Sequence, residues 1–161
     1  MLKIYAESVK ESLGFQFDPE EIFFTFSKKH VFRGMHFQGS PHKISKVVSI
    51  IQGKATDYLL DLRSHSSTFG NLQIVDLSEE DPSSIFIPTG IAHGYLSLSE
   101  NTIISYMFDG DFCANCDTGI SGREIEEFLP ITFADAIKSE RDQFLPSFEI
   151  FKYKTKCEPC E

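Results

Sequence analysis

The sequence has no tryptophan, a deficit of cationic side chains and no long apolar run. Fifteen Lys and Arg stand against 24 Asp and Glu, which gives a net charge of −9. Non-specific nucleic-acid binding depends on cations that neutralise phosphates, so this balance argues against a nucleic-acid partner. A local cationic pocket for a small phosphorylated ligand is still compatible with it.

No apolar stretch approaches the ~20 residues of a membrane span, and the first residues lack the basic start and apolar core of a secretory signal. We therefore expect a cytoplasmic protein that does not bind membranes. A chain of 161 residues fits one domain with one apolar core. We expect a single domain over 1–161, with an N-terminal arm at 1–20 and a C-terminal tail at 145–161.

Short β-prone segments alternate with turn signals along most of the chain. Sixteen phenylalanines and many Ile and Val favour pleated, half-buried surfaces. KVVSII and ATDYLLDLR, joined through Gln52–Lys54, have the pattern of a β-hairpin. Further strands are expected at 21–26, 31–37, 72–77, 84–87, 94–98 and 102–108. This spacing predicts an all-β barrel or sandwich, with a polar loop at 111–123 and one helix at 132–144.

Three cationic or titratable side chains, Arg33, His36 and Lys46, lie just before or inside these β-branched runs. Alternation places Lys46 on the same face as Val48 and Ile50. Burying such groups without partners costs several kcal/mol, so we interpret them as part of a binding or catalytic site. A base near neutral pH, a cation for an anionic ligand and a second cation for an oxyanion suit proton abstraction next to a carbonyl.

Several motifs occur in a fixed order: RGMHFQ, the spaced Lys46, GKATDYLLDLR, STFG, IPTGIAHGY and KSERD. Together they resemble the dTDP-4-dehydrorhamnose 3,5-epimerase family of cupin-like sugar nucleotide enzymes, from about residue 32 to 142. The resemblance implies an all-β, cupin-like double-stranded β-helix (a jelly-roll barrel) with a short C-terminal helix. It also implies a homodimer. The usual cupin ligand set begins HxH, whereas Phe37 and Gln38 follow His36, so no catalytic metal or other cofactor is expected.

The resemblance also implies roles for four residues. His36 is the general base that removes the proton alpha to a C4 ketone, and Asp142 pairs with it. Tyr106 returns a proton from the opposite face of the sugar, and Lys46 stabilises the enolate oxygen. Each residue also has a plain structural explanation: a packed strand histidine, a core tyrosine, a carboxylate on a helix surface and a lysine that extends to solvent from a strand edge.

Four further residues are expected to contact the substrate. Arg33 and His93 match positions that line the pocket, and Arg33 is assigned to substrate or phosphate contact. Gln38 is assigned to the same pocket. Asp57 is a candidate to orient His93.

One departure from the family concerns the nucleotide. The strand before RGMH usually carries a QxNxS pattern that contacts the nucleotide, but Glu21, Phe23 and Thr25 occupy those positions here. The tryptophan-containing stretch after the acid tyrosine is also missing. The sequence therefore does not specify which nucleotide is bound.

All four cysteines lie in two CxxC pairs, Cys113 with Cys116 and Cys157 with Cys160. In a protein without an export signal, this spacing suggests a metal or redox site more than structural disulfides. We hypothesise a structural Zn²⁺ bound by Cys113, Cys116, Cys157 and Cys160, within one chain or across a dimer. Such a metal would pin the tail over the loop that follows the Tyr106 strand. Four free thiols or disulfides are the alternatives.

The leading functional hypothesis is an epimerase of an NDP-4-keto-6-deoxysugar, or a related 4-keto sugar nucleotide, that inverts C3, C5 or both. One alternative keeps the fold and changes the chemistry to a 3,4-ketoisomerase or single-centre epimerase. A further alternative is a non-catalytic cupin-like sugar-binding module.

Overall fold

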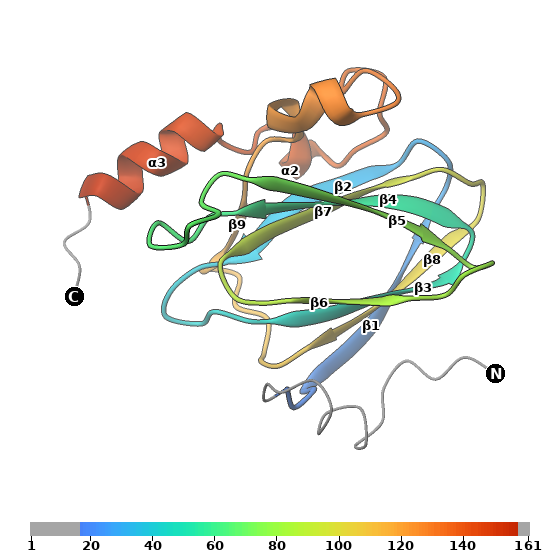
Figure 1. Cartoon of the computed structure of the whole chain (residues 1–161), viewed down its shortest axis with the longest axis horizontal. Helices are drawn as coiled ribbons and strands as arrows, with labels where there is room; N and C mark the ends of the chain where they lie inside the picture. The colour runs from blue at the N-terminus through green and yellow to red at the C-terminus, as the bar shows by residue number, and fades with distance from the viewer. Residues whose placement is uncertain (1–16, 158–161) are drawn as a thin grey trace.

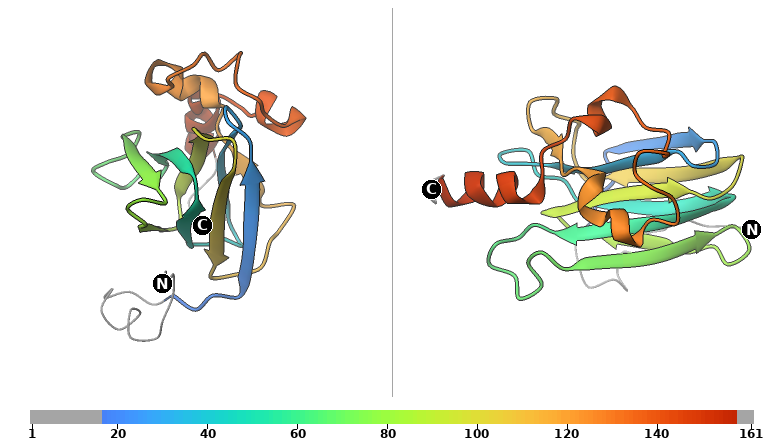
Figure 2. Two further views of the ribbon diagram at one scale, coloured as in Figure 1. Left: turned by 90° about the vertical axis from the view of Figure 1, so that its right-hand side faces the viewer. Right: turned by 90° about the horizontal axis from the view of Figure 1, so that it is seen from above.

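Two antiparallel β-sheets face each other in the computed structural model, which describes residues 17–157 and the side chains of 17–152 (Figures 1 and 2). One sheet has four strands in the order β1-β8-β3-β6, and the other has five in the order β5-β4-β7-β2-β9. The strands are β1 (Glu21–Ser27), β2 (Phe32–Gln38), β3 (Lys46–Gln52), β4 (Lys54–Asp61), β5 (Leu72–Ser78), β6 (Ser84–Ile87), β7 (Ile91–Ser97), β8 (Thr102–Phe108) and β9 (Asp117–Gly119). The predicted all-β architecture is confirmed.

Three helical segments follow the strands: η1 (Gly122–Phe128), α2 (Glu140–Gln143) and α3 (Phe148–Cys157). Figure 1 shows η1 and α2 over the outer face of the five-stranded sheet. Among the described residues, no helix is both long and apolar enough to cross a bilayer.

The helix predicted over 132–144 is wrong, since only Glu140–Gln143 is helical there. The backbone of Ile137 explains the difference, because it pairs with the segment that leads into β2. Its N–H donates to the carbonyl of His30 at 2.8 Å, and its carbonyl accepts from the N–H of Phe32 at 2.8 Å. These long-range bonds use groups that a continuous helix would need for itself.

Two strand predictions also need correction. β7 begins at Ile91, three residues before the predicted start at Gly94. The loop predicted at 111–123 contains the short strand β9, which pairs with the end of β2 through His36 and Gly119.

The buried apolar side chains form three layers. Between the sheets, Val48, Ile50, Leu59, Ile104 and Tyr106 belong to one cluster. A second cluster, on the outer side of the five-stranded sheet, joins strand residues such as Met35 and Tyr58 to side chains from the helical cover. A small third cluster on the outer side of the other sheet contains Phe17 and Met107.

Strand β2 contains a bulge at Gly34 that decides which side chains face the interior. Its register against β7 shifts between Arg33 and His36. In a regular strand, residues three apart point to opposite faces. Here Arg33 and His36 line the same cavity, because the bulge adds one residue to β2 between them. Gly34 has φ +127, and a Cβ at this position would lie 2.4 Å from the Cα of Gly94.

We expect Gly34→Ala to lower the free energy of unfolding by about 2–4 kcal/mol, because alanine is strained at this φ and would collide with β7. Urea denaturation measures the loss. Gly39→Ala is the matched control, since its Cβ would meet only an ordinary contact, 3.6 Å from the carbonyl oxygen of Cys116. Equal stability of Gly34→Ala and the wild type would contradict this account of the bulge.

Candidate active site

A cavity of about 320 Å³ is lined by side chains from both sheets and from α2. The five-stranded sheet contributes Arg33, His36 and His93. Lys46 and Tyr106 come from the four-stranded sheet, and Asp142 comes from α2. The structure therefore brings together, around one space, residues that are far apart in the sequence.

His36 and Asp142 form a close pair. His36 Nε2 lies 2.6 Å from Asp142 Oδ1, and the carboxylate is almost fully buried while the imidazole is partly open to the cavity. Burial alone would raise the pKa of Asp142, but the hydrogen bond and charge of His36, together with the backbone N–H of Gly34 and the side-chain hydroxyl of Ser139, lower it overall. The carboxylate is thus ionised at neutral pH and fixes the imidazole, leaving Nδ1 to take up a proton.

The local chain explains how Asp142 reaches β2. Ser139 is the N-cap of α2, and its hydroxyl accepts a hydrogen bond from the N–H of Asp142 at 3.1 Å. This cap fixes the first turn of a very short helix. The second oxygen of Asp142, Oδ2, lies 3.5 Å from the N–H of Gly34 in the bulge. The carboxylate therefore contacts both the imidazole of His36 and the backbone that orients it.

Lys46 is buried in the wall opposite His36. Its Nζ donates to the carbonyl of His36 at 3.2 Å. Burial lowers the pKa of Lys46 to about 8, although the negative charges of Asp117 and Asp57 partly oppose the shift. At pH 7 the amine is therefore mostly a cation in a place of low dielectric, where it can stabilise a developing oxyanion.

A second histidine–carboxylate pair lies deeper in the same region. His93 Nε2 is 3.1 Å from Asp57 Oδ2, and both side chains are buried. Burial lowers the pKa of His93 despite the opposing effect of Asp57, so we assign a neutral imidazole that donates from Nε2. Within the described residues, Asp57 Oδ1 has no hydrogen-bond partner.

Tyr106 lies on the inner face of β8 with its ring between other aromatic rings. Phe23 of β1 stacks on it at 5.0 Å between centroids, nearly parallel, and the ring of His93 is 5.9 Å away. Burial, reinforced by Tyr95 and Asp57, raises the pKa of Tyr106 well above its usual value. The phenol therefore stays protonated and is suited to donate a proton rather than to accept one.

Two of the predicted substrate contacts differ in character. Arg33 is exposed, and it donates to the hydroxyl of Ser27 at 3.2 Å. Gln38 lines the cavity but is buried, and its amide is occupied by backbone. Nε2 donates to the carbonyls of His42 and Asp111 at 2.5 and 3.2 Å, and Oε1 accepts from the N–H of Cys113 at 2.9 Å. We therefore interpret Gln38 as a residue that positions two loops.

Two cavity residues, Asp117 and Arg141, had not been predicted from the sequence. Asp117 of β9 forms an ion pair with Arg141 at 2.7 Å. Arg141 precedes Asp142 in the KSERD motif, which is the one sequence signal that pointed to it. Asp117 follows a cysteine motif, and no local pattern indicated that it would lie near Lys46.

Comparison with known proteins identifies the family. The model of the dTDP-4-dehydrorhamnose 3,5-epimerase family matches residues 1–149. The chain belongs to this family. A family member from Mycobacterium tuberculosis is 29% identical over 139 residues, which cover 84% of this chain and 69% of that protein. Another, from Methanothermobacter thermautotrophicus, is 36% identical over 122 residues, or 74% of this chain and 65% of that one.

Solved structures of epimerases share the fold. The enzyme from Bacillus anthracis, determined with TDP and PPi bound, has a TM-score of 0.83 at 30% identity and covers 91% of this chain and 84% of its own. The Legionella pneumophila enzyme, in complex with dTDP-4-keto-L-rhamnose, has a TM-score of 0.82 at 27% identity, with 93% and 80% covered. These likenesses confirm the family and the cupin-like fold expected from the ordered motifs.

We expect Lys46→Met to raise the free energy of unfolding at pH 7 by roughly 1–3 kcal/mol, because it removes a desolvated charge. The lowered pKa means that the folded protein binds fewer protons than the unfolded chain between about pH 8 and the usual value of 10.5. The wild type therefore gains stability from this group as pH rises through that window.

The advantage of Lys46→Met should accordingly shrink by more than half between pH 7 and pH 9.5, as measured by urea denaturation. Lys54→Met is the matched control, since Lys54 is an exposed partner of Glu80. A pH-independent difference between Lys46→Met and the wild type would contradict the lowered pKa.

Proposed function

We propose that the protein epimerises a nucleoside diphosphate 4-keto-6-deoxysugar at C3, C5 or both. The observation that carries this proposal is the placement of His36 and Tyr106. His36 is on β2 of one sheet, Tyr106 is on β8 of the facing sheet, and both line one cavity. A base and an acid on opposite walls suit a reaction in which the proton leaves one face of a carbon and another arrives on the opposite face.

In this mechanism His36 Nδ1 removes the proton alpha to the ketone, and Asp142 stabilises the imidazolium that forms. The electrons of the C–H bond move into the carbonyl and produce an enolate. The ammonium of Lys46 stabilises the enolate oxygen, an interaction that is stronger in the transition state than in the ground state. Tyr106 then donates its proton to the opposite face of the carbon. The chemistry requires no cofactor.

Arg33 is proposed to bind the diphosphate, because guanidinium groups pair well with phosphate oxygens. Arg33 and Arg141 are both exposed cations of the cavity, but Arg141 forms an ion pair with Asp117, whereas Arg33 donates to the neutral oxygens of Ser27 and Phe26. Relatives solved with TDP and PPi, and with dTDP-4-keto-L-rhamnose, support a nucleoside diphosphate deoxysugar as the substrate. Phe23 and Thr25 line the same cavity, so they are proposed to shape the part of it that discriminates between substrates.

Incubation with dTDP-4-keto-6-deoxyglucose in D₂O tests this proposal. We expect NMR to show deuterium entering C3, C5 or both, and His36→Asn to slow the exchange by about 10²–10⁴-fold because it removes the base. His65→Asn, in an exposed loop, is the matched control. Exchange at the wild-type rate in His36→Asn would refute the assignment of the base.

Tyr106→Phe separates abstraction from inversion in the same assay. The base is intact in this variant, so substrate exchange should persist while formation of the inverted product falls by about 10²-fold or more. A product inverted at the normal rate would assign the acid elsewhere. A product in which the ketone has moved to C3 would support the ketoisomerase alternative.

We also propose that the active protein is a homodimer that associates through β1. This strand is at the edge of its sheet, and its outward side chains Ile22, Phe24 and Phe26 are 59%, 50% and 69% exposed. An exposed edge with a row of apolar side chains is a surface that proteins normally cover.

Sedimentation velocity at micromolar concentration should therefore give the mass of two chains. Replacing Phe24 and Phe26 together by Glu should produce a folded monomer, since it places charge on the proposed contact surface. Phe144→Glu is the control, because Phe144 is 78% exposed but lies in the C-terminal segment. A monomeric wild type would refute the dimer.

A further inference from the structure

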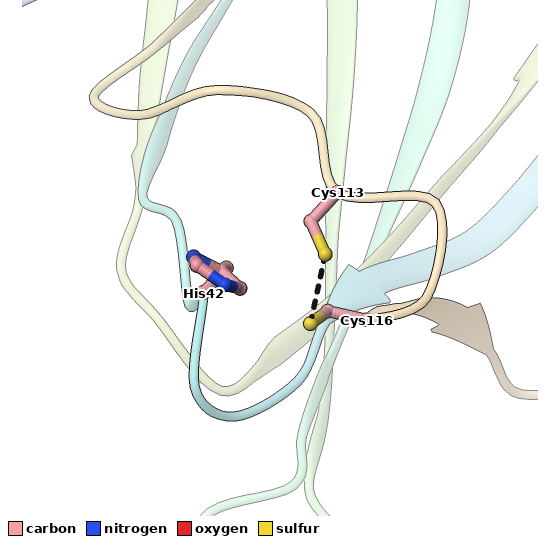
Figure 3. A group of neighbouring side chains, drawn as sticks. All are labelled: His42, Cys113 and Cys116. Atoms are coloured by element: carbon pink, nitrogen blue, oxygen red, sulfur yellow. Dashed lines mark hydrogen bonds between the residues drawn. The ribbon is translucent and has the colours of Figure 1, made fainter.

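Two loops beside the cavity bring together one histidine and two cysteines. His42 lies in the loop after β2, and Cys113 and Cys116 lie in the loop between β8 and β9 (Figure 3). One ligand atom from each residue lies within 4.8 Å of the other two. The mechanism proposed above uses none of the three.

The two sulfur atoms are separated by 3.0 Å. This is longer than the ~2.05 Å of a disulfide and shorter than the ~3.8 Å expected between two thiolates bound tetrahedrally at ~2.3 Å from one Zn²⁺. If the two sulfur atoms moved apart by less than ~1 Å, they could therefore both bind the metal. The backbone around them forms a tight turn, because the N–H groups of Cys116 and Asp117 both donate to the carbonyl of Cys113, at 3.0 and 2.9 Å.

The three side chains are open to solvent. Cys113 and Cys116 are only partly buried and His42 is exposed, so an ion can enter from solvent.

Hydrogen bonds hold the two loops next to each other. The side chain of Gln38 forms hydrogen bonds with the backbone of His42 in one loop and with the backbone of Asp111 and Cys113 in the other. The N–H of Gly39 donates to the carbonyl of Cys116 at 2.8 Å. The candidate ligands are thus positioned by contacts that do not involve a metal, which reduces the ordering cost of binding one.

We propose that His42, Cys113 and Cys116 bind one Zn²⁺ with three protein ligands and a fourth coordination position. Two thiolates and an imidazole are a ligand set that favours Zn²⁺ over the hard cations Mg²⁺ and Ca²⁺. His42 replaces part of the predicted four-cysteine set. The side chains of Cys157 and Cys160 lie outside the described residues, so their participation is decided by the experiment below.

The metal would act on the cavity wall rather than on the reacting atoms. The same two loops carry Ile44 and Phe112, which line the cavity, and β9 with Asp117 begins directly after Cys116. Joining the loops through Zn²⁺ would fix these groups. Loss of the metal should therefore raise KM more than it lowers kcat.

Untagged protein dialysed with Zn²⁺ and then against metal-free buffer should retain about one zinc per chain by mass spectrometry of the metal. Cys113→Ser should abolish retention, and His42→Ala should weaken the affinity at least about tenfold. His65→Ala, another exposed histidine, is the matched control and should behave as the wild type. Co²⁺ in place of Zn²⁺ should give a thiolate-to-cobalt absorption that Cys113→Ser removes.

The double variant Cys157→Ser with Cys160→Ser identifies the fourth ligand. If this double variant retains all of its zinc, the fourth ligand is water. If it loses part of its zinc, the fourth ligand is a terminal cysteine. Both outcomes support the proposal as long as Cys113→Ser still abolishes zinc binding. Zinc that depends only on the terminal pair would overturn the proposal. A wild-type protein that retains no zinc would also overturn the proposal. The mass of the intact protein then tells free thiols from a disulfide, which is lighter by two hydrogens. Thermal unfolding with and without Zn²⁺ gives a readout that is independent of epimerase activity.

Discussion

The hydrogen bond between His36 and Asp142 is the interaction on which the site depends. It joins β2 to a segment that covers the outer face of the same sheet, so the imidazole of His36 is positioned by an element more than 100 residues away in the sequence. The bond requires the bulge at Gly34, which turns His36 inward and directs a backbone N–H toward the same carboxylate. The bulge at Gly34, the N-cap at Ser139 and the carboxylate of Asp142 therefore act together to position the imidazole of His36.

The remaining groups show how a β-sandwich can hold charge in its interior. Lys46 and the His93–Asp57 pair are buried in the interior, where loss of hydration opposes the charge of Lys46 and the carboxylates of Asp117 and Asp57 offset only part of that effect. Such groups cost stability in the resting protein. They give in return a low-dielectric space in which a single ammonium or phenol acts strongly on a reacting sugar.

Much of this arrangement was predictable because local patterns coincide with tertiary structure. Alternation in KVVSII placed Lys46 inward correctly, and the ordered motifs gave the family and the fold. The helix predicted over 132–144 failed because the backbone of Ile137 pairs with distant residues, which propensity does not describe. The approach of His42 to Cys113 depends on two loops meeting across the fold, and Asp117 approaches Lys46 through the pairing of β9 with β2. No spacing within one segment encodes either contact.

Strand β1 connects the surroundings of Tyr106 to the outside of the molecule. Phe23 faces inward and stacks on Tyr106, while its neighbour Phe24 faces outward into solvent. Adjacent side chains of one strand share a backbone, so a shift of β1 at its outer surface would also move the ring that packs on Tyr106. The packing around this phenol is therefore only one residue away from the apolar outer surface of the strand.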